Sequence, residues 1–249
     1  MKYFYFVLFS FLLLACSSNE GSESSKSHDN SSRIKVASPN DTIKKVNRDY
    51  KVSGDLCDVQ SVNSKIRIEL KYATNDNFVK KVLYKKIDKA YLQKDVAIRL
   101  SKCQDYLTSL HPDLHLLVYD AVRPVSVQQI MWTSLDSIPV NRRVKFVSNP
   151  KNRSIHNYGA AVDLTICNAA GIPLDMGAKY DEIDSIAYPS LESRFLKRGL
   201  LSKEQVANRF ILRKVMASQH FTGIASEWWH FNACSRQSAA LKYQLMLEE

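Results

Sequence analysis

The spacing of apolar positions along the chain predicts a mixture of strands and helices. Strands are predicted where polar and apolar side chains alternate or where a short apolar run occurs, over residues 65–72, 114–119, 160–167 and 227–232. Helices are predicted where apolar positions recur at helical spacing, over residues 91–110, 125–136 and 189–217. These elements do not alternate as they do in a doubly wound sheet. The pattern therefore predicts an α+β domain, with a small, mostly antiparallel sheet flanked by helices.

The N-terminus has the pattern of an export signal. Lys2 is followed by an apolar run over residues 3–14, which is too short for a stable membrane-spanning helix. The run ends in Ala15 and Cys16, similar to a bacterial lipobox, in which the cysteine is lipidated and becomes the first residue of the mature chain. An ordinary signal peptide followed by a coincidental cysteine is the alternative. We expect residues 1–15 to be a lipoprotein signal peptide, and the protein to be a lipoprotein of the bacterial cell envelope that faces the periplasm or the exterior.

The next segment predicts a tether. Residues 17–50 are rich in Ser, Asn, Lys and Asp and contain too little apolar surface to offset the entropy lost on ordering. We therefore assign residues 16–54 to the lipidated cysteine and a flexible linker, and residues 55–249 to the folded domain. The net charge of +10 favours anionic surfaces such as phospholipid and wall polymers, with simple solubility as the alternative. Nucleic acid is not an expected partner of an exported protein.

Four cysteines remain after Cys16, namely Cys57, Cys103, Cys167 and Cys234. An oxidising compartment permits disulfides, and four cysteines allow three pairing patterns. Free buried cysteines are an equally good interpretation. None of the four has Cys-x-x-Cys spacing, so the sequence does not indicate a cysteine-rich zinc site.

Three residues have the chemistry of a catalytic zinc site. Such a site takes three protein ligands, usually histidine nitrogens and carboxylate oxygens, and keeps one position open for water. His156, Asp163 and His230 would supply two nitrogens and one oxygen. Gly159 permits a tight chain reversal between His156 and the strand that carries Asp163. The alternative for Asp163 is a salt-bridged carboxylate on the surface.

Glu227 lies three residues before His230 and is a candidate general base. Zinc lowers the pKa of a bound water toward roughly 7, and a nearby carboxylate can then remove the proton. Residues three apart on a strand face opposite sides, so Glu227 is expected in a turn just before the strand. The alternative is that Glu227 is merely exposed. The adjacent Trp228 and Trp229 are expected to pack in the core.

Arg123 is a candidate for stabilising developing negative charge. It precedes a proline, which holds its backbone extended, and its planar guanidinium can donate two hydrogen bonds to a carboxylate or an oxyanion. The alternative is a structural ion pair with Asp120.

These segments together resemble the D-alanyl-D-alanine dipeptidases of the vancomycin-resistance VanX type, within the zinc D,D-peptidase group. The matching segments run in order from about residue 65 to 234. They are Leu70 to Phe78 (LKYATNDNF), Tyr119 to Pro124 (YDAVRP), Ser154 to Asp163 (SIHNYGAAVD), Asp175 to Asp181 (DMGAKYD) and Glu227 to His230 (EWWH). The fourth segment resembles a Met-Gly-x-x-Phe-Asp motif. Val122 departs from the family, which has an aromatic residue before the arginine.

The resemblance implies a specific activity and specific roles. It implies one zinc per chain held by His156, Asp163 and His230, Glu227 as the base that activates water, and Arg123 as the group that stabilises the tetrahedral intermediate. Asp181 would bind the free ammonium group of the substrate, and Ser154 and Tyr72 would line the pocket. The substrate would be the dipeptide D-Ala-D-Ala, hydrolysed to two D-alanines. Because the chain has an export signal, wall turnover or scavenging of D-alanine is the expected purpose.

Two other functions remain open from the sequence. The same ligand set is compatible with a D,D- or L,D-carboxypeptidase or endopeptidase that acts on intact wall peptides, although Asp181 favours a dipeptidase. A non-catalytic envelope-binding lipoprotein with a structural zinc is the alternative of another class. Glu227 and Arg123 argue against it, because binding alone requires neither residue.

Overall fold

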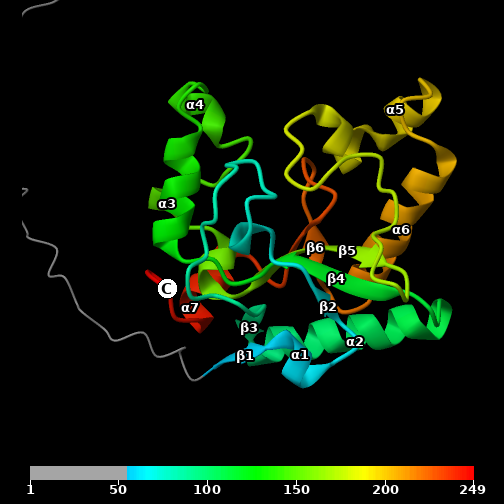
Figure 1. Ribbon diagram of the computed structural model, residues 1–249, viewed down its shortest axis with the longest axis horizontal. Coiled ribbons are helices and arrows are strands. Elements are labelled where there is room, and N and C mark those ends of the chain that lie inside the picture. Colours follow the sequence, from blue (N-terminus) through cyan, green and yellow to red (C-terminus); the bar gives the residue numbers. More distant parts are fainter. Residues whose placement is uncertain (1–54) are drawn as a thin grey trace, which may run out of the picture. The chain divides into compact units, whose positions relative to one another are not determined.

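The computed structural model describes residues 55–249 (Figure 1). Within these residues the larger sheet has five strands in the order β2–β4–β5–β7–β6. Their bounds are β2 Arg67–Ile68, β4 His115–Asp120, β5 Ala161–Cys167, β7 His230–Asn232 and β6 Thr222–Gly223. Only β2 pairs in parallel with its neighbour, so the expected α+β fold with a mostly antiparallel sheet is confirmed. A separate antiparallel pair joins β1 (Leu56–Asp58) to β3 (Tyr91–Gln93).

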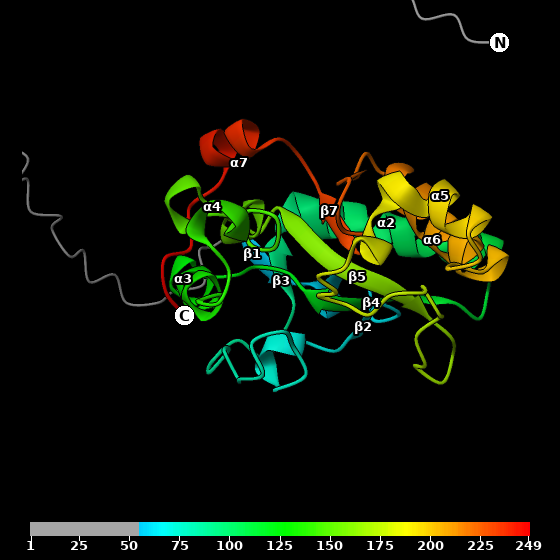
Figure 2. The same cartoon turned by 90° about the horizontal axis from the view of Figure 1, so that it is seen from above.

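The helices surround this sheet. They are α1 Val59–Val62, α2 Lys94–Leu110, α3 Val125–Ser134, α4 Val140–Arg143, α5 Glu192–Lys197, α6 Lys203–Ala217 and α7 Arg236–Lys242. Helix α2 runs along the sheet, and the pairs α3–α4 and α5–α6 lie at its opposite ends in both views (Figures 1 and 2). Both ends therefore supply loops that reach over the strands between them.

Helix α2 forms because its apolar side chains fall on one side at helical spacing. Val96, Leu100, Cys103 and Leu107 are all fully buried against the core. Gln104 lies in the same buried stripe, where its Oε1 accepts a hydrogen bond of 2.7 Å from the backbone N–H of Leu116. The helix is thus fixed to the start of β4 by a polar contact as well as by apolar packing.

Strand β5 is buried along its whole length, on both faces. Asp163 is only 3 % exposed, so the alternative of a surface carboxylate at this position is wrong. The cause is Tyr180, which covers this face of the strand. Its hydroxyl contacts Asp163, and its ring packs near Tyr119 and Trp229.

Two expected elements differ from the structure. The helix expected over residues 189–217 is divided into α5 and α6, because Gly199 adopts a left-handed backbone (φ 67°) and Ser202 caps a new helix in a capping box with Gln205. The strand expected over residues 65–72 ends at Ile68 and is followed by a 3-10 turn over Lys71–Ala73. That turn buries Tyr72, which is 2 % exposed, beneath the functional site.

The remaining expected elements lie close to their expected positions. The helix expected over residues 91–110 is α2, which begins at Lys94 because residues 91–93 form β3. The last strand begins at His230, and Glu227 lies in the turn before it, as expected. Trp228 and Trp229 are both 3 % exposed, which confirms that they pack in the core.

Cys57, Cys103, Cys167 and Cys234 are all unpaired thiols in the structure, which agrees with the free-cysteine interpretation. Among residues 55–249, no helix has the length and apolar character needed to cross a bilayer. The predicted signal peptide, Cys16 and the tether lie outside the described residues.

Candidate metal and peptidase site

The register of the sheet brings three titratable residues into one row. Asp120 on β4 lies opposite Asp163 on β5, after a shift in register at the end of β4. Asp163 in turn lies opposite His230 on β7. Side chains directly opposite on antiparallel strands lie on the same face of the sheet. Two of the three expected zinc ligands are therefore neighbours because of strand pairing alone.

The third expected ligand, His156, is positioned by a short 3-10 turn over Ile155–Tyr158. Ser154 caps this turn in a capping box with Asn157, and Gly159 ends it in a left-handed backbone conformation (φ 63°). The left-handed conformation favours glycine, and a Cβ atom here would lie 2.6 Å from the Cδ2 atom of Leu56, whose side chain would have to move. The reversal predicted from the sequence is confirmed, and it returns His156 to the side of Asp163.

The three ligand atoms face one another closely. His156 Nε2 lies 3.2 Å from Asp163 Oδ1 and 3.2 Å from His230 Nδ1, and the last two atoms are 2.9 Å apart. Atoms bound to one tetrahedral zinc at about 2.0–2.2 Å lie roughly 3.3 Å from each other. The spacing therefore fits a single small cation.

The hydrogen bonds of the two imidazoles support the same conclusion. His156 Nδ1 lies 2.6 Å from the carbonyl oxygen of Ala121, and His230 Nε2 lies 2.9 Å from Oδ1 of Asn232. Both partners accept hydrogen bonds, which favours the tautomers in which these two ring nitrogens carry the protons. In those tautomers the opposite nitrogens present lone pairs toward Oδ1 of Asp163, an arrangement that a bound cation would stabilise.

Arg123 forms the ion pair with Asp120 that the sequence left open, and it also lines the cavity. Its Nε donates to Oδ2 of Asp120 at 2.8 Å, so the ion pair with Asp120 is present. Its Nη1 donates to Gln128, and its Nη2 lies 3.4 Å from Oδ2 of Asp163. The side chain also lines the cavity beside the three ligand atoms. The ion pair therefore holds the guanidinium in place next to the site.

Glu227 stands beside the metal ligands without joining them. Its Oε2 is 3.9 Å from His230 Nδ1, and its side chain is 22 % exposed to the cavity. Burial and the nearby charges of Asp163 and Asp181 raise the pKa of its carboxyl to about 7, although His230 opposes them. The carboxyl of Glu227 is thus near the midpoint of its titration at neutral pH.

Asp181 also lines the cavity and stands in the irregular segment that follows β5. Its backbone is left-handed (φ 60°), and each of its carboxylate oxygens is 3.0 Å from the hydroxyl of Tyr72. Burial, followed by the charge of Asp163, raises the pKa of Asp181 to about 7. Among the described residues, no ion pair joins Asp181 to a lysine or arginine. The hydroxyl of Tyr72, a neutral group, is its hydrogen-bond partner. A bound cation next to Asp181 would stabilise the ionised carboxylate.

One cavity of about 190 Å³ connects all of these groups. Every site residue expected from the sequence lines it: Tyr72, Arg123, Ser154, His156, Asp163, Asp181, Glu227 and His230. The sequence did not identify Tyr180, whose hydroxyl lies 3.0 Å from Oδ2 of Asp163. Its only signal was its position directly before Asp181.

The sequence is similar to those of one family of known proteins. Residues 52–245 match the sequence model of a family described as Peptidase M15, D-Ala-D-Ala dipeptidase. The D-alanyl-D-alanine dipeptidase of Escherichia coli K12 is 33 % identical over 71 % of this chain and 83 % of its own length. That of Synechocystis PCC 6803 is 27 % identical over 57 % of this chain and 68 % of its own. A solved structure of the LD-carboxypeptidase LdcB aligns with 76 % of this chain and 72 % of its own, at 16 % identity and a TM-score of 0.35.

Proposed function

The chain belongs to the D-alanyl-D-alanine dipeptidase family, and we propose that it hydrolyses D-Ala-D-Ala to two D-alanines with one zinc ion per chain. The zinc would be held by His156, Asp163 and His230, and the lone pairs that these residues direct at one point support this. Zinc at such a site polarises the scissile carbonyl and makes water more acidic.

Glu227 would move the proton. Its carboxylate lines the cavity, and Oε2 lies 3.9 Å from Nδ1 of His230. At this distance Glu227 is near the proposed metal site without being one of its ligands. Its carboxylate can take a proton from the attacking water and return it to the leaving amine, and burial in the cavity favours acceptance of that proton. Glu227 therefore acts as base and then as acid.

Arg123 would stabilise the charge that develops on the carbonyl oxygen. The ion pair with Asp120 and the bond to Gln128 fix the plane of the guanidinium before substrate arrives. Donors that are already oriented do not have to reorganise during the reaction, which is the main source of such stabilisation. Positioning by Asp120 and catalysis by Arg123 are therefore compatible roles.

Asp181 supports the choice of a dipeptidase over a carboxypeptidase. It is a half-buried carboxyl without an ion pair to a lysine or arginine among the described residues, and it faces the same cavity as the proposed metal ligands. The free ammonium group of a dipeptide would supply that partner. Tyr72 would orient the carboxylate, and the hydroxyl of Ser154 would contribute a polar group to the wall of the pocket. In a longer wall peptide this ammonium group is replaced by an amide, which carries no charge.

The decisive experiment tests the contact with Asp181 from both sides. Wild-type enzyme should cleave D-Ala-D-Ala well and its N-acetylated form poorly, whereas Asp181→Ala should have a raised KM for the free dipeptide and a much smaller difference between the two substrates. Glu182→Gln, which changes the neighbouring carboxylate in the same loop, is the control and should discriminate like the wild type. Equal cleavage of both substrates by the wild type would overturn the dipeptidase and favour the carboxypeptidase.

We also propose that the protein acts at the bacterial envelope, anchored by lipid on Cys16. The support is the sequence of the first 16 residues alone. The purpose would then be turnover of wall fragments or scavenging of released dipeptide. Native protein should partition into detergent with membranes and carry lipid by mass spectrometry, and Cys16→Ser should do neither. If the two proteins fractionate alike without lipid, the anchor is wrong.

A further inference from the structure

The two oxygens of Asp163 have different surroundings. Oδ1 faces the ligand nitrogens of His156 and His230, at 3.2 Å and 2.9 Å. Oδ2 points away from them and accepts a 3.0 Å hydrogen bond from the hydroxyl of Tyr180. The only other donor to Oδ2 among the described residues is Arg123, at the long distance of 3.4 Å. Tyr180 therefore makes the best hydrogen bond to the oxygen that faces away from the histidines.

The ring of Tyr180 is held in place by other aromatic rings. Its centroid lies 5.1 Å from that of Tyr119, 5.4 Å from that of Trp229 and 6.1 Å from that of Tyr72, all in tilted or edge-on geometry. A ring packed on several sides cannot easily rotate its hydroxyl away. The hydrogen bond to Asp163 is therefore enforced by packing that does not depend on the bond itself.

We propose that Tyr180 is a positioning residue that fixes Asp163 as a ligand through Oδ1 alone. Binding Oδ2 leaves a single carboxylate oxygen to complete the triangle with the two histidine nitrogens, which suits a four-coordinate ion with one open position. Without the hydroxyl, the carboxylate is free to rotate or to engage Arg123 more closely. This inference rests on the proposed zinc site and adds a residue to it.

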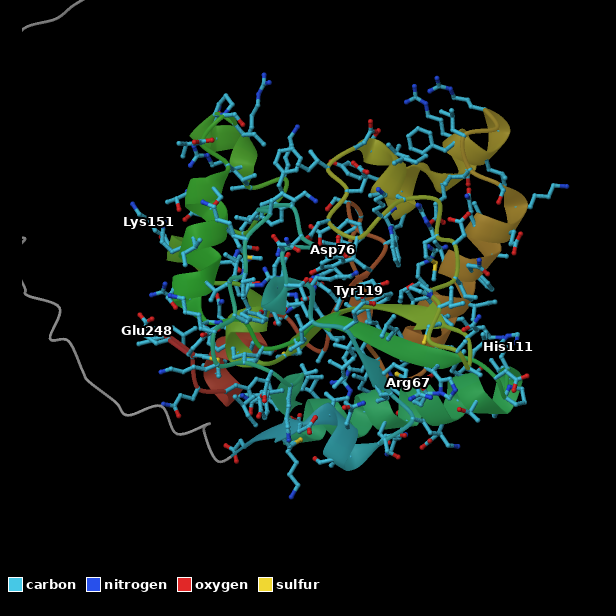
Figure 3. All side chains as sticks on the ribbon, viewed as in Figure 1. Arg67, Asp76, His111, Tyr119, Lys151 and Glu248 are labelled. Atoms are coloured by element: carbon cyan, nitrogen blue, oxygen red, sulfur yellow. The ribbon has the colours of Figure 1, made fainter. Side chains whose placement is uncertain are left out.

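The test is zinc affinity, measured by competition with a chelator of known affinity. Tyr180→Phe removes only the hydroxyl and should weaken zinc binding by about 10–100-fold, the usual effect of losing a partner that orients a ligand. Tyr119→Phe is the matched control. Tyr119 projects from β4 and packs on the same ring, yet its hydroxyl donates to none of the described residues (Figure 3). Its zinc affinity should equal that of the wild type. Thermal unfolding of the three proteins checks that each is folded.

The possible outcomes separate this inference from the proposed function. If Tyr180→Phe binds zinc as tightly as the wild type, or if both variants weaken it equally, Tyr180 has no specific role as a positioning residue. His156→Ala is measured in the same assay, and if it retains full affinity, the zinc site itself is wrong. At saturating zinc, Tyr180→Phe should still discriminate between free and acetylated dipeptide, because Asp181 and Tyr72 are unchanged. Loss of that discrimination would mean that the substitution has displaced the loop, and would also overturn the inference.

Discussion

Two groups of residues at the site are held in different ways. Asp163 and His230 stand on paired strands and His156 stands on a capped turn, so main-chain hydrogen bonds fix all three. Tyr180 and Asp181 stand in the irregular segment between β5 and α5, where Asp181 is in a left-handed conformation. The proposed metal ligands are thus held by regular structure, and the proposed contact with the substrate's ammonium group lies on a loop.

The loop has its own support, which comes from helix α6. Arg209 is 1 % exposed, and its guanidinium donates to the backbone carbonyls of Met176 (2.6 Å) and Ile186 (3.0 Å). These two carbonyls lie on either side of Tyr180 and Asp181 in the sequence. The buried side chain of Arg209 therefore connects both ends of the loop over residues 176–186 to helix α6.

The largest expected effect comes from removing a ligand on the sheet side. His230→Ala should lose most of its zinc and nearly all activity, because two ligands hold the ion far less tightly than three. Elemental analysis of the purified protein gives the stoichiometry. His111→Ala, at the far end of α2, should keep the full zinc content of the wild type (Figure 3). If His230→Ala still contains one zinc per chain, the metal is not bound by His156, Asp163 and His230.

Glu227→Gln should have the next largest effect and should separate chemistry from metal binding. The amide cannot accept the proton, so kcat should fall by about 10²–10⁴-fold, while zinc content stays near one per chain. Steady-state kinetics and metal analysis on the same sample provide the test. A variant that loses its zinc would place Glu227 among the ligands instead of beside them.

Substitution of Arg209 tests the support of the loop side. Arg209→Met should raise KM for the free dipeptide more than it lowers kcat, and should leave zinc binding intact. It should also destabilise the protein, because each lost hydrogen bond from a charged donor is worth about 1.5–3 kcal/mol. Nη1 of Arg209 also lies 3.5 Å from Oε1 of Glu192. Arg213→Met is the matched control, since Arg213 donates to the same Glu192 carboxylate and to no backbone carbonyl between Met176 and Ile186 among the described contacts. An equal rise in KM in both variants would mean that α6 supports the site only through general stability.

The smallest expected effect is on stability, and it depends on pH. The pKa of Asp181 in the folded protein, about 7, lies above the value near 4 of an unfolded chain, so the folded state retains a proton that the unfolded state releases. The stability that this proton provides is present at acid pH and is lost as pH rises from about 4 to 7. Asp181→Asn keeps an acceptor for Tyr72 but cannot ionise. Without metal, its melting temperature relative to the wild type should therefore be higher at pH 8 than at pH 5. If the difference in melting temperature between the two proteins is the same at both pH values, ionisation of Asp181 does not destabilise the folded state.

The same contrast explains what could be predicted from the sequence. The ligands and Glu227 could be predicted because each lies in a short motif where residue type and spacing already restrict the chemistry, and Gly159 signalled the reversal between two of them. Tyr180 could not be predicted, because a phenol in an irregular segment has no periodicity, and its contact with Asp163 depends on how the loop folds back over β5. The division of α5 from α6 was missed because apolar spacing continues across Gly199 and Ser202, although both are ordinary signals for the end and start of helices.

The segment around His156 is also held by contacts that span almost the whole of the described chain. Its neighbours come from both extremes of the described chain. Gly159 lies against Leu56 near the start, and the backbone N–H of Met246 donates to the carbonyl oxygen of Asn157 at 2.8 Å. Contacts between residues so distant in sequence form slowly, because the intervening chain must first be ordered. The turn that carries His156 therefore reaches its final form late in folding, after segments near both ends of the described chain have packed against it.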